Sequence, residues 1–347
     1  MKPNRALLSS LGCSLALLTV HCGHDTDEET TTSPPHTPSS SQSGQSDLTN
    51  KSNDDKTDTA TTEDTDKAVE NKTIPKEFLA NAGDGWQTLV IGSWEIPPNK
   101  EIYHCVRMTL PKDISIGAVR ALSPRGTHHT LLTIADDTSM ADGESPCDAG
   151  TNGTQEIAGS GVGTNDFSLP DGVAITLKAG QQLLLNLHLF NTTDEPIRGT
   201  SGTLIKLLAA DEVQHHAEGV LAGTVTLDLP PGAKTTQRGT CTVQDDVTLV
   251  AAAPHMHQLG TYQKAVAHSS VQGDVVLRDG PYSFDEQLIY ALPELIEMKT
   301  GDKIDVECTY ENTTDQAVKF GNGSLAEMCF TGLYWYPAMG RQFVCVK

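Results

Sequence analysis

Aromatic and basic residues are scarce in this 347-residue chain, and their distribution limits what the chain can be. Phe, Trp and Tyr make up 5% of the residues, and none of them precedes Phe78. Residues 1–77 therefore lack the large side chains that dominate packed cores, so the folded part is expected to begin near residue 78. The chain has 24 Lys and Arg against 45 Asp and Glu, a formal charge of −21. Because phosphate neutralisation requires clustered basic side chains, this balance argues against a nucleic-acid partner.

Several sequence motifs of enzyme chemistry are also missing. The chain has no Gly-X-Ser-X-Gly elbow, no phosphate-binding glycine loop and no dinucleotide fingerprint. No two cysteines have the close CxxC spacing of a zinc site or a redox-active dithiol. Acidic residues are abundant, but nothing marks two of them as the catalytic pair of a glycosidase. The classes that depend on these motifs are therefore poor hypotheses.

The amino terminus has the pattern of an export signal. Residues 1–22 combine two basic residues with the apolar run Leu15–Val20, followed by Cys22. This run is too short to span a membrane, and its Cys resembles the acylated first residue of a bacterial lipoprotein. Simple secretion with cleavage nearby is the alternative. We expect an exported protein, either a lipoprotein of the bacterial outer membrane or cell surface or a periplasmic protein, that contacts membrane only through its lipid anchor.

Residues 23–77 are rich in Ser, Thr, Asp, Glu, Lys and Pro. Such a segment buries too little apolar surface to offset the entropy of ordering, so it is expected to form a disordered tether. Six of the eight cysteines lie beyond it, in the folded region. In an exported protein an even set of cysteines predicts disulfides, here three, and the sequence alone allows 15 pairings.

The folded region contains an internal repeat. The run from Lys178 to Asp194 recurs 121 residues later, from Lys299 to Asp315, with the Lys, the Gly and the whole Asn-Thr-Thr-Asp shared. Each copy begins with a Gly turn, continues through alternating apolar residues and ends at a polar turn, which is the pattern of a strand between loops. The repeat predicts two related domains in tandem, residues 78–211 and residues 212–347.

Other short apolar runs between Gly, Pro, Asn and Asp residues predict further strands. The predicted strands are Trp86–Ile91, Tyr103–Leu110, His129–Ile134, Val173–Leu177, Val220–Leu227, Val247–Ala252 and Val275–Leu277. Only Pro293–Lys299 is expected to form a single helical turn. Together these patterns predict an all-β fold of two tandem jelly-roll β-sandwich domains, preceded by the signal peptide and the tether.

The histidines are the most informative residues of the sequence. Positions i and i+2 of a strand face the same side, so His255 and His257 can present two imidazoles to one ion while Met256 faces away. Met328 follows later in the chain and by itself is a typical core residue. Imidazole together with a thioether suits copper, whereas zinc more commonly recruits carboxylate or thiolate.

A second candidate group is His128-His129 with His188. Adjacent residues of a regular strand point to opposite faces, so His128 and His129 can share an ion only if the backbone kinks there; Pro124 and Gly126 favour such a kink. A single histidine such as His188 is more commonly a packing residue than a ligand. The same interpretation applies to the remaining histidines of the folded region, namely His104, His215, His216 and His268.

The order His-His, His, His-X-His and Met resembles the copper type II ascorbate-dependent monooxygenases, the family of peptidylglycine α-hydroxylating monooxygenase and dopamine β-monooxygenase. The resemblance covers about residues 95–347. Its motifs are Thr127-His128-His129-Thr130, Leu185-Asn186-Leu187-His188, Pro254-His255-Met256-His257-Gln258-Leu259-Gly260 and Glu327-Met328-Cys329, the last followed by Tyr334-Trp335-Tyr336-Pro337.

The resemblance implies two copper ions per chain, with O2 and with ascorbate or another one-electron donor as co-substrate. It implies that His128, His129 and His188 hold the electron-supplying copper. It likewise implies that His255, His257 and Met328 are catalytic and hold the oxygen-activating copper. The disulfides that it implies are Cys105–Cys147, Cys241–Cys345 and Cys308–Cys329. The family fold, two jelly-roll domains with one copper each, agrees with the internal repeat.

The sequence also departs from the family pattern. The peptide-amidating members carry an Arg two residues before the His-X-His, and an Asn and a Tyr just after the Met-Cys pair, which bind the substrate's carboxylate. Ala253, Phe330 and Gly332 occupy these positions here, so the clamp is missing and peptidylglycine is not the expected substrate. Asn186 stands where a longer amide is expected.

Three hypotheses therefore remain open. The first is an exported, monomeric monooxygenase that hydroxylates a small-molecule or peptide-like substrate. The second is a non-catalytic copper-binding lipoprotein, and the third is a surface adhesion module whose histidines are incidental.

Overall fold

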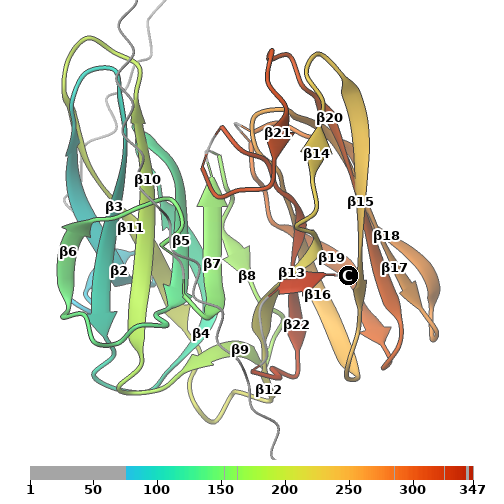
Figure 1. Ribbon diagram of the computed structural model, residues 1–347. Coiled ribbons are helices and arrows are strands. Elements are labelled where there is room, and N and C mark those ends of the chain that lie inside the picture. The colour runs from blue at the N-terminus through green and yellow to red at the C-terminus, as the bar shows by residue number, and fades with distance from the viewer. Residues whose placement is uncertain are drawn as a thin grey trace, which may run out of the picture. The chain divides into compact units, whose positions relative to one another are not determined.

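The computed structural model describes residues 76–340, apart from residues 152, 162, 285 and 324, and residues 344–346 (Figure 1). These residues lie within one compact unit, Ala68–Lys347. The expected signal at 1–22 with Cys22, and the expected tether at 23–77 except for its last two residues, lie outside the described residues. All regular elements in the described ranges are strands, and none of these ranges offers a helix long and apolar enough to cross a membrane.

The first β-sandwich contains a seven-stranded and a five-stranded sheet. The order in the larger sheet is β1-β2-β11-β4-β9-β12, with β8 also paired to β4, and the order in the smaller sheet is β6-β3-β10-β5-β7. The strands are β1 (Asn81–Gly83), β2 (Trp86–Ile96), β3 (Lys100–Thr109), β4 (Ile114–Leu122), β5 (Thr127–Ile134), β6 (Gly143–Pro146), β7 (Gln155–Gly161), β8 (Phe167–Ser168), β9 (Val173–Leu177), β10 (Gln182–Asn191), β11 (Ile197–Leu207) and β12 (His215–His216).

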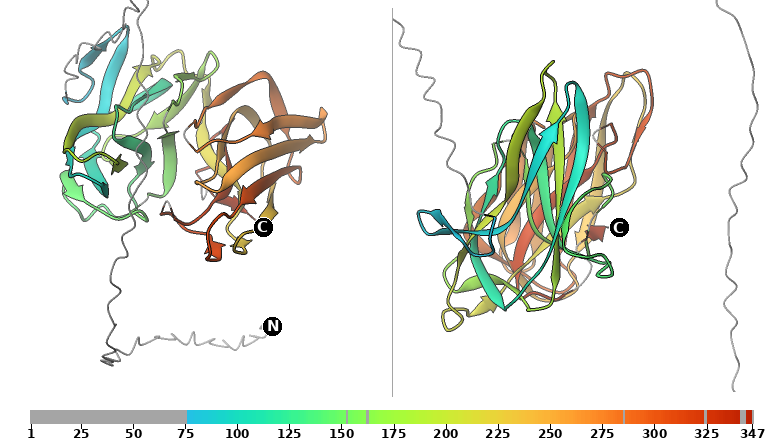
Figure 2. Two further views of the ribbon diagram at one scale, coloured as in Figure 1. Left: turned by 90° about the horizontal axis from the view of Figure 1, so that it is seen from above. Right: turned by 90° about the vertical axis from the view of Figure 1, so that its left-hand side faces the viewer.

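The second β-sandwich contains a five-stranded sheet, β19-β16-β22-β13-β23, and a four-stranded sheet, β15-β20-β17-β18, with the short pair β14-β21 beside them. Figure 2 shows its orange and red strands as a set separate from the blue and green strands of the first sandwich. The strands are β13 (Glu218–Thr224), β14 (Asp228–Leu229), β15 (Lys234–Thr242), β16 (Val247–His255), β17 (Gly260–Ser269), β18 (Gly273–Pro281), β19 (Tyr290–Met298), β20 (Lys303–Glu311), β21 (Val318–Lys319), β22 (Cys329–Tyr336) and β23 (Val344–Val346).

The all-β fold of two sandwiches that the sequence predicts is confirmed. β12 pairs with β9 of the first sandwich, whereas β13 pairs with β22 of the second. The chain therefore passes from one sandwich to the other between β12 and β13. The domain bounds at residues 211 and 212 stay a prediction. Three disulfides join Cys105 to Cys147, Cys241 to Cys345 and Cys308 to Cys329, which are the pairs implied by the family resemblance.

One expectation is wrong: Pro293–Lys299 forms no helical turn, because residues 293–298 belong to β19, an edge strand that ends at Met298. The ladder between β16 and β19 jumps from Ile296 opposite Leu249 to Ala291 opposite Ala251. Pro293 therefore falls in an irregular stretch at a sheet edge, where a residue without a backbone N–H is tolerated. Ile296 and Met298 are buried on either side of the exposed Glu297, which is the alternation of a strand.

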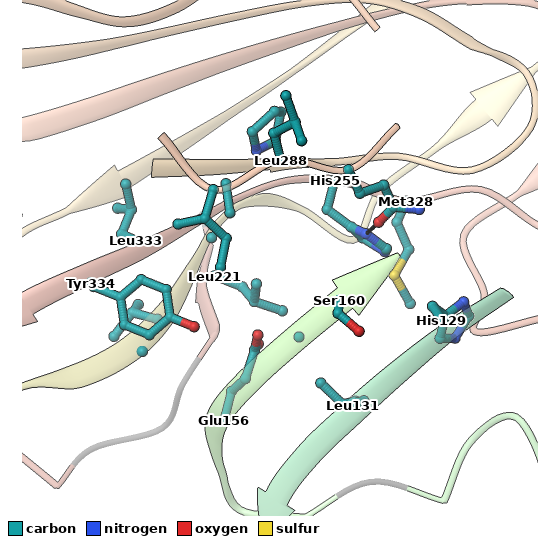
Figure 3. A pocket seen from close by; sticks show the side chains of 18 of the residues that line it. His129, Leu131, Glu156, Ser160, Leu221, His255, Leu288, Met328, Leu333 and Tyr334 are labelled. Atoms are coloured by element: carbon teal, nitrogen blue, oxygen red, sulfur yellow. Dashed lines mark hydrogen bonds between the residues drawn. The ribbon is translucent and has the colours of Figure 1, made fainter. Parts of the chain in front are cut away.

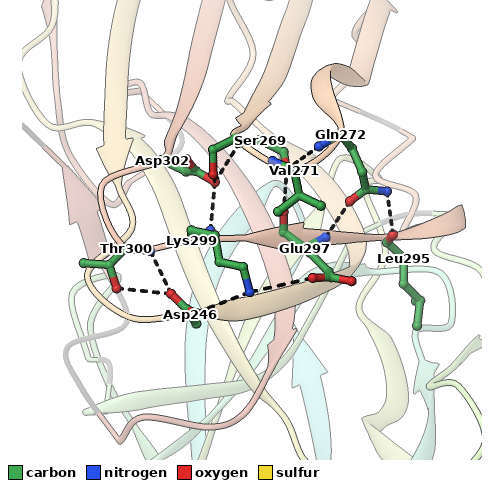
Figure 4. A network of polar contacts seen from close by, with 10 residues as sticks. Asp246, Ser269, Val271, Gln272, Leu295, Glu297, Lys299, Thr300 and Asp302 are labelled. Atoms are coloured by element: carbon green, nitrogen blue, oxygen red, sulfur yellow. Dashed lines mark hydrogen bonds and ion pairs between the residues drawn. The ribbon is translucent and has the colours of Figure 1, made fainter.

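The internal repeat of the sequence is a structural repeat. Its two copies form β10 and β20, each a strand in the middle of its own sheet. Before β10 the carboxylate of Asp113 accepts hydrogen bonds from Lys178 Nζ at 2.9 Å and from the backbone N–H of Ala179 at 2.8 Å. Before β20 the corresponding turn has Asp246 bound to the backbone N–H of Thr300 at 3.0 Å and to Lys299 Nζ at 3.3 Å (Figure 4).

The shared Asn-Thr-Thr-Asp ends each of these strands with the same set of hydrogen bonds around its buried Asn, which we call an asparagine knot. Asn191 Nδ2 donates to the carbonyls of Ile96, Pro97 and Glu195, while its Oδ1 accepts from the backbone and hydroxyl of Thr193. Asn312 makes the matching bonds to the carbonyls of Leu229, Pro230 and Gln316 and to Thr314. Both asparagines are 1% exposed. Each knot satisfies buried backbone carbonyls where the strand ends, as burial requires.

The two sandwiches share apolar packing inside the compact unit. Val250, Ala251 and Tyr334 of the second sandwich belong to the core cluster of the first. The Tyr334 ring lies 4.9 Å from the Phe167 ring, centroid to centroid. The Asn165 side chain donates to the carbonyl of Ile289 at 3.1 Å and accepts from its N–H at 2.9 Å. The loop before β19 is therefore attached to the first sandwich, and this loop carries side chains of the candidate site.

Candidate metal centre

Three histidines converge at one end of the smaller sheet of the first sandwich. His129 on β5 stands opposite His188 on β10, but the next paired residues are Thr127 and Leu189, so His128 is the extra residue of a β-bulge. Gly126 precedes it with φ +100°, a conformation that few other residues adopt. The backbone kink expected between His128 and His129 is confirmed, and it brings both rings to the same side as His188.

The three rings turn their Nδ1 atoms toward one point. His129 Nδ1 lies 3.3 Å from His128 Nδ1 and 3.2 Å from His188 Nδ1. One ligand atom from each ring lies within 4.8 Å of the other two, so the trio could hold a metal ion. Burial, followed by the neighbouring His188 and His128, holds the pKa of His129 well below its usual value. Neutral imidazoles are the form that binds metal.

Two residues of β3 fix the orientation of His188, which is 1% exposed. His188 Nε2 lies 2.5 Å from Glu101 Oε1, and the Tyr103 ring stacks on the imidazole at 4.5 Å with a 6° interplanar angle. The Tyr103 hydroxyl also donates to Glu101, at 3.3 Å. With the Nε2 proton directed to a carboxylate, Nδ1 is left as the ligand atom, the arrangement found around metal-binding histidines. Burial lowers the pKa of His188 despite the opposing effect of Glu101.

A second group lies where β16 meets β22 in the second sandwich. His255 ends β16 and stands opposite Phe330 of β22, and continuing this register places Met328 across from His257. The His255 and His257 rings lie 5.3 Å apart, centroid to centroid, at 87°. Met256, between them, is fully buried in the core of the second sandwich, so it faces away from the two imidazoles as expected.

Hydrogen bonds leave the Nε2 atoms of these two imidazoles available. His255 Nδ1 lies 3.1 Å from Gln287 Oε1, and His257 Nδ1 lies 2.9 Å from the carbonyl oxygen of Ala326. Since both partners are acceptors, each Nδ1 carries the proton. Burial lowers the pKa of His255, and burial together with His255 lowers the pKa of His257 to about 3.

The backbone around this group is held by buried polar side chains. Glu327 accepts from the N–H of His257 at 2.8 Å and from the N–H of Leu259 at 2.6 Å. Burial raises the pKa of Glu327 to about 7 against the opposing effect of these bonds. The Tyr310 hydroxyl donates to the carbonyl of Met328 at 2.5 Å, and the disulfide of Cys329 follows directly. The turn carrying His257 and the segment carrying Met328 are thus fixed to each other.

One cavity of about 120 Å³ is lined by His129 of the first group and by His255 and Met328 of the second (Figure 3). The Phe284 ring lies beside both groups, with its centroid 4.2 Å from that of His128 and 5.9 Å from that of His257. Phe284 and Gln287 belong to the loop before β19. Imidazoles from both sandwiches therefore meet in one partly closed, largely apolar space.

The other described histidines lie outside these groups, as the sequence interpretation held. His104 contacts Glu144, and His268 lies between Asp274 and Asp305. His215 stacks on Tyr336, and His216 contacts Thr176. Asn186 is buried and donates to the carbonyls of Asp148 and Thr151, so it holds the loop after Cys147.

Four side chains of the site carry no signal in the sequence. Glu101 and Tyr103 on β3, and Phe284 and Gln287 in the loop before β19, lie in no motif, and each contacts a histidine of another strand or turn. The register between β3 and β10, which pairs Tyr103 with His188, is the information that would have identified the first two. That register is a long-range property that the local pattern does not determine.

Comparisons with known proteins agree with this geometry. Residues 217–347 match the sequence profile of the copper type II ascorbate-dependent monooxygenase C-terminal domain. A human protein called putative DBH-like monooxygenase protein 2 is 27% identical in an alignment of length 281 that covers 72% of this chain and 56% of that protein. Dopamine beta-hydroxylase of the dog is 26% identical in an alignment of length 201 that covers 52% of this chain and 32% of that protein. The chain thus spans about half the length, or less, of the curated relatives that it matches.

Solved structures of infectious bursal disease virus particles align over 73% of the chain with a TM-score of 0.19 and 10% identity, which is too low to carry any argument. The similarity to the copper type II ascorbate-dependent monooxygenase family rests on residues 217–347, which match its C-terminal domain, and on these relatives.

Proposed function

We propose that this protein is an exported monooxygenase that hydroxylates a C–H bond with O2 and an external reductant such as ascorbate. In this proposal it holds two copper ions, one on His128, His129 and His188 and the other on His255, His257 and Met328. The observation that carries the proposal is that the Nδ1 atoms of the first three histidines converge on one point, while His129, His255 and Met328 line one cavity. The domains at 78–211 and 212–347 would each contribute one site. The three disulfides support export, since such bonds persist in oxidising compartments.

The donor sets fit copper and differ in a way that suits two tasks. Neither group contains a carboxylate or thiolate, the ligands that zinc commonly adds to imidazole. Bound copper would supply one-electron redox chemistry and, at the site with the thioether, an open position for O2. Met328 is a soft, weak ligand, whereas the first group offers three imidazoles. The first site would therefore have three nitrogen ligands from the chain, and the second would have two nitrogen ligands and one sulfur ligand.

The remaining residues position the ligands and shape the site. Glu101 and Gln287 each hold one imidazole by the nitrogen that faces away from its site. Phe284 lies beside an imidazole of each group, and the walls of the cavity are largely apolar. A substrate in the cavity would lie beside His255 and Met328, so its orientation there would select the C–H bond that reacts.

A copper titration of the full chain, followed by electron paramagnetic resonance and by ascorbate-driven oxygen consumption, tests the proposal. We expect two tightly retained coppers with nitrogen ligands, and oxygen consumption that depends on both. Met328→Ile should abolish oxygen consumption and preserve the fold, since isoleucine keeps the bulk and removes the sulfur. The matched control is Met140→Ile, because Met140 is 47% exposed and does not line the cavity.

The outcomes separate the competing functions. Two bound coppers without oxygen consumption would indicate the non-catalytic copper-binding lipoprotein instead. Loss of copper on dialysis would contradict both and favour the adhesion module. Undiminished oxygen consumption by the Met328 variant would refute the assignment of Met328 as a ligand.

A further inference from the structure

Thr164 and Asn165 lie between β7 and β8 of the first sandwich, yet their side chains hold the loop before β19 of the second. The Thr164 hydroxyl accepts from the N–H of Gly161 at 2.8 Å and donates to the carbonyl of Gln287 at 2.6 Å. The carbonyl of Gly161 lies 3.0 Å from the same hydroxyl, so the nearer carbonyl of Gln287 takes its single proton. Asn165 Nδ2 donates to the carbonyl of Ile289 at 3.1 Å, and its Oδ1 accepts from the N–H of Ile289 at 2.9 Å. Three backbone groups of the loop are therefore bound from the first sandwich.

The Gln287 side chain rests on the backbone of Gly161. A Cβ added to Gly161 would lie 2.8 Å from Gln287 Cδ and 3.0 Å from its Cβ and Cγ, so a larger residue would displace this side chain. Gln287 Nε2 donates to the carbonyl of Phe284 at 3.2 Å, and Gln287 Oε1 lies 3.1 Å from His255 Nδ1. Gly161 stands opposite His129 in the ladder between β5 and β7. Two residues, Gly161 and Gln287, therefore connect a histidine of the first group to a histidine of the second.

The amide of Gln287 determines which nitrogen of His255 is free to bind a metal. The bond from Nε2 to Phe284 fixes which end of the amide faces the imidazole. Since Oε1 accepts hydrogen bonds and cannot donate them, it keeps the proton of His255 on Nδ1 and leaves Nε2 unprotonated. Partners of this kind orient metal ligands and affect how tightly the metal is held. The position of the Gln287 backbone therefore matters for the site of His255.

We propose that Thr164 and Asn165 are positioning residues of the second metal site, because they hold the loop of Gln287 so that His255 keeps its Nδ1 proton and offers Nε2. This inference rests on the proposed function, since it takes His255 as a copper ligand. The site of His255, His257 and Met328 is then incomplete within the second sandwich alone. Residues 217–347, which match the family profile, include these three ligands but neither positioning residue.

The first measurement follows the tautomer of His255 in the copper-free full chain, by long-range proton–nitrogen correlation NMR at about pH 8, where an imidazole is neutral. Wild-type His255 should show a protonated Nδ1 and an unprotonated Nε2. Thr164→Val removes the hydroxyl at nearly constant volume, and Asn165→Ala removes both bonds to Ile289, so each should give a mixture of the two tautomers. Thr164→Ser keeps the hydroxyl and should retain the wild-type signal.

The second measurement is the copper affinity of each site, from a competition titration resolved by electron paramagnetic resonance. Thr164→Val and Asn165→Ala should weaken the site of His255 about three- to tenfold, the effect of roughly one lost hydrogen bond, and leave the site of His188 unchanged. The matched control is Phe167→Leu, which weakens the ring contact with Tyr334 between the sandwiches but keeps all three hydrogen bonds to the loop. It should retain the wild-type tautomer and change both affinities by less than about twofold.

The outcomes separate positioning from simple attachment of the sandwiches. A wild-type His255 signal in both Thr164→Val and Asn165→Ala would overturn the proposal. An equal change in Phe167→Leu would also overturn it, because the hydrogen bonds would then act only by holding the sandwiches together. Thr164→Val and Thr164→Ser differ by little in volume, so this pair decides the matter even if Asn165→Ala folds poorly. Because the tautomer is read without copper, its change supports the positioning role whether or not the protein consumes oxygen.

Discussion

Glu156→Gln should stabilise the protein at alkaline pH and have little effect at acidic pH. Glu156 lies on β7 and lines the cavity that His255 and Met328 also line, and burial raises its pKa in the folded protein from 4.5 to about 7. Between these values the folded state binds more protons than the unfolded state, so stability falls as pH rises through the folded pKa. At about 1.36 kcal/mol per pH unit, the interval corresponds to about 3 kcal/mol lost above pH 7. Glutamine resembles the neutral acid and avoids that loss.

Urea unfolding followed by tryptophan fluorescence measures this effect on copper-free protein at pH 5 and pH 8. The signal is suitable because Trp86, Trp94 and Trp335 are all buried. We expect the variant to exceed wild type by about 2–3 kcal/mol at pH 8 and by less than about 1 kcal/mol at pH 5. Other titrating groups, including His129 and His255 in the same cavity, are common to both proteins and largely cancel.

The result is informative in either direction. A gain of equal size at both pH values would mean that glutamine improves packing and that the carboxylate is not the cause. No gain at pH 8 would mean that Glu156 is hydrated or paired, so that burial does not raise its pKa. Glu294→Gln, at an exposed position, should leave stability within about 0.5 kcal/mol of wild type at both pH values.

Three further substitutions test the site and the fold. Glu101→Gln should weaken copper binding at the site of His188 by about 10–100-fold and leave the other site unchanged, in a competition titration resolved by electron paramagnetic resonance. Gln287→Leu should weaken the site of His255 by a similar factor and spare the first site; a loss at both sites, or at neither, would contradict the assigned partners. Asn312→Ala removes the three side-chain donations to carbonyls and should lower the free energy of unfolding by about 2–4 kcal/mol in urea; an unchanged unfolding midpoint would refute the role of the knot.

The fold and the main histidine groups were accessible from the sequence because they depend on local patterns. Alternation of apolar residues gave most of the strands, and the repeat of Lys178–Asp194 at Lys299–Asp315 reflects two strands with the same end structures. The kink at His128 was also predictable, since the two adjacent rings could share an ion only through a bulge. The failure at Pro293–Lys299 has a local cause as well, because one proline in an apolar run fits both a helix start and an edge strand.

The surroundings of the histidines could not be predicted, because strand register and loop contacts determine them. Glu101 reaches His188 through pairing between β3 and β10, and Gln287 reaches His255 from a loop attached to the other sandwich. Glu156 is conspicuous only once its cavity is known. In a chain with 45 acidic residues, nothing in the sequence distinguishes the one that faces apolar walls.

The two asparagine knots determine which host cells are suitable for producing the protein. Asn191 and Asn312 each begin an Asn-Thr-Thr tripeptide, the acceptor for oligosaccharide transfer in the eukaryotic secretory pathway. In the folded chain each side-chain nitrogen donates to three carbonyls and is closed to solvent, so no sugar can be attached there. Oligosaccharide transfer to the nascent chain, before the knots form, would attach a glycan to an amide that each sandwich must bury. Secretion from yeast or insect cells would therefore yield misfolded protein. Production in a bacterial periplasm without glycosylation avoids this outcome.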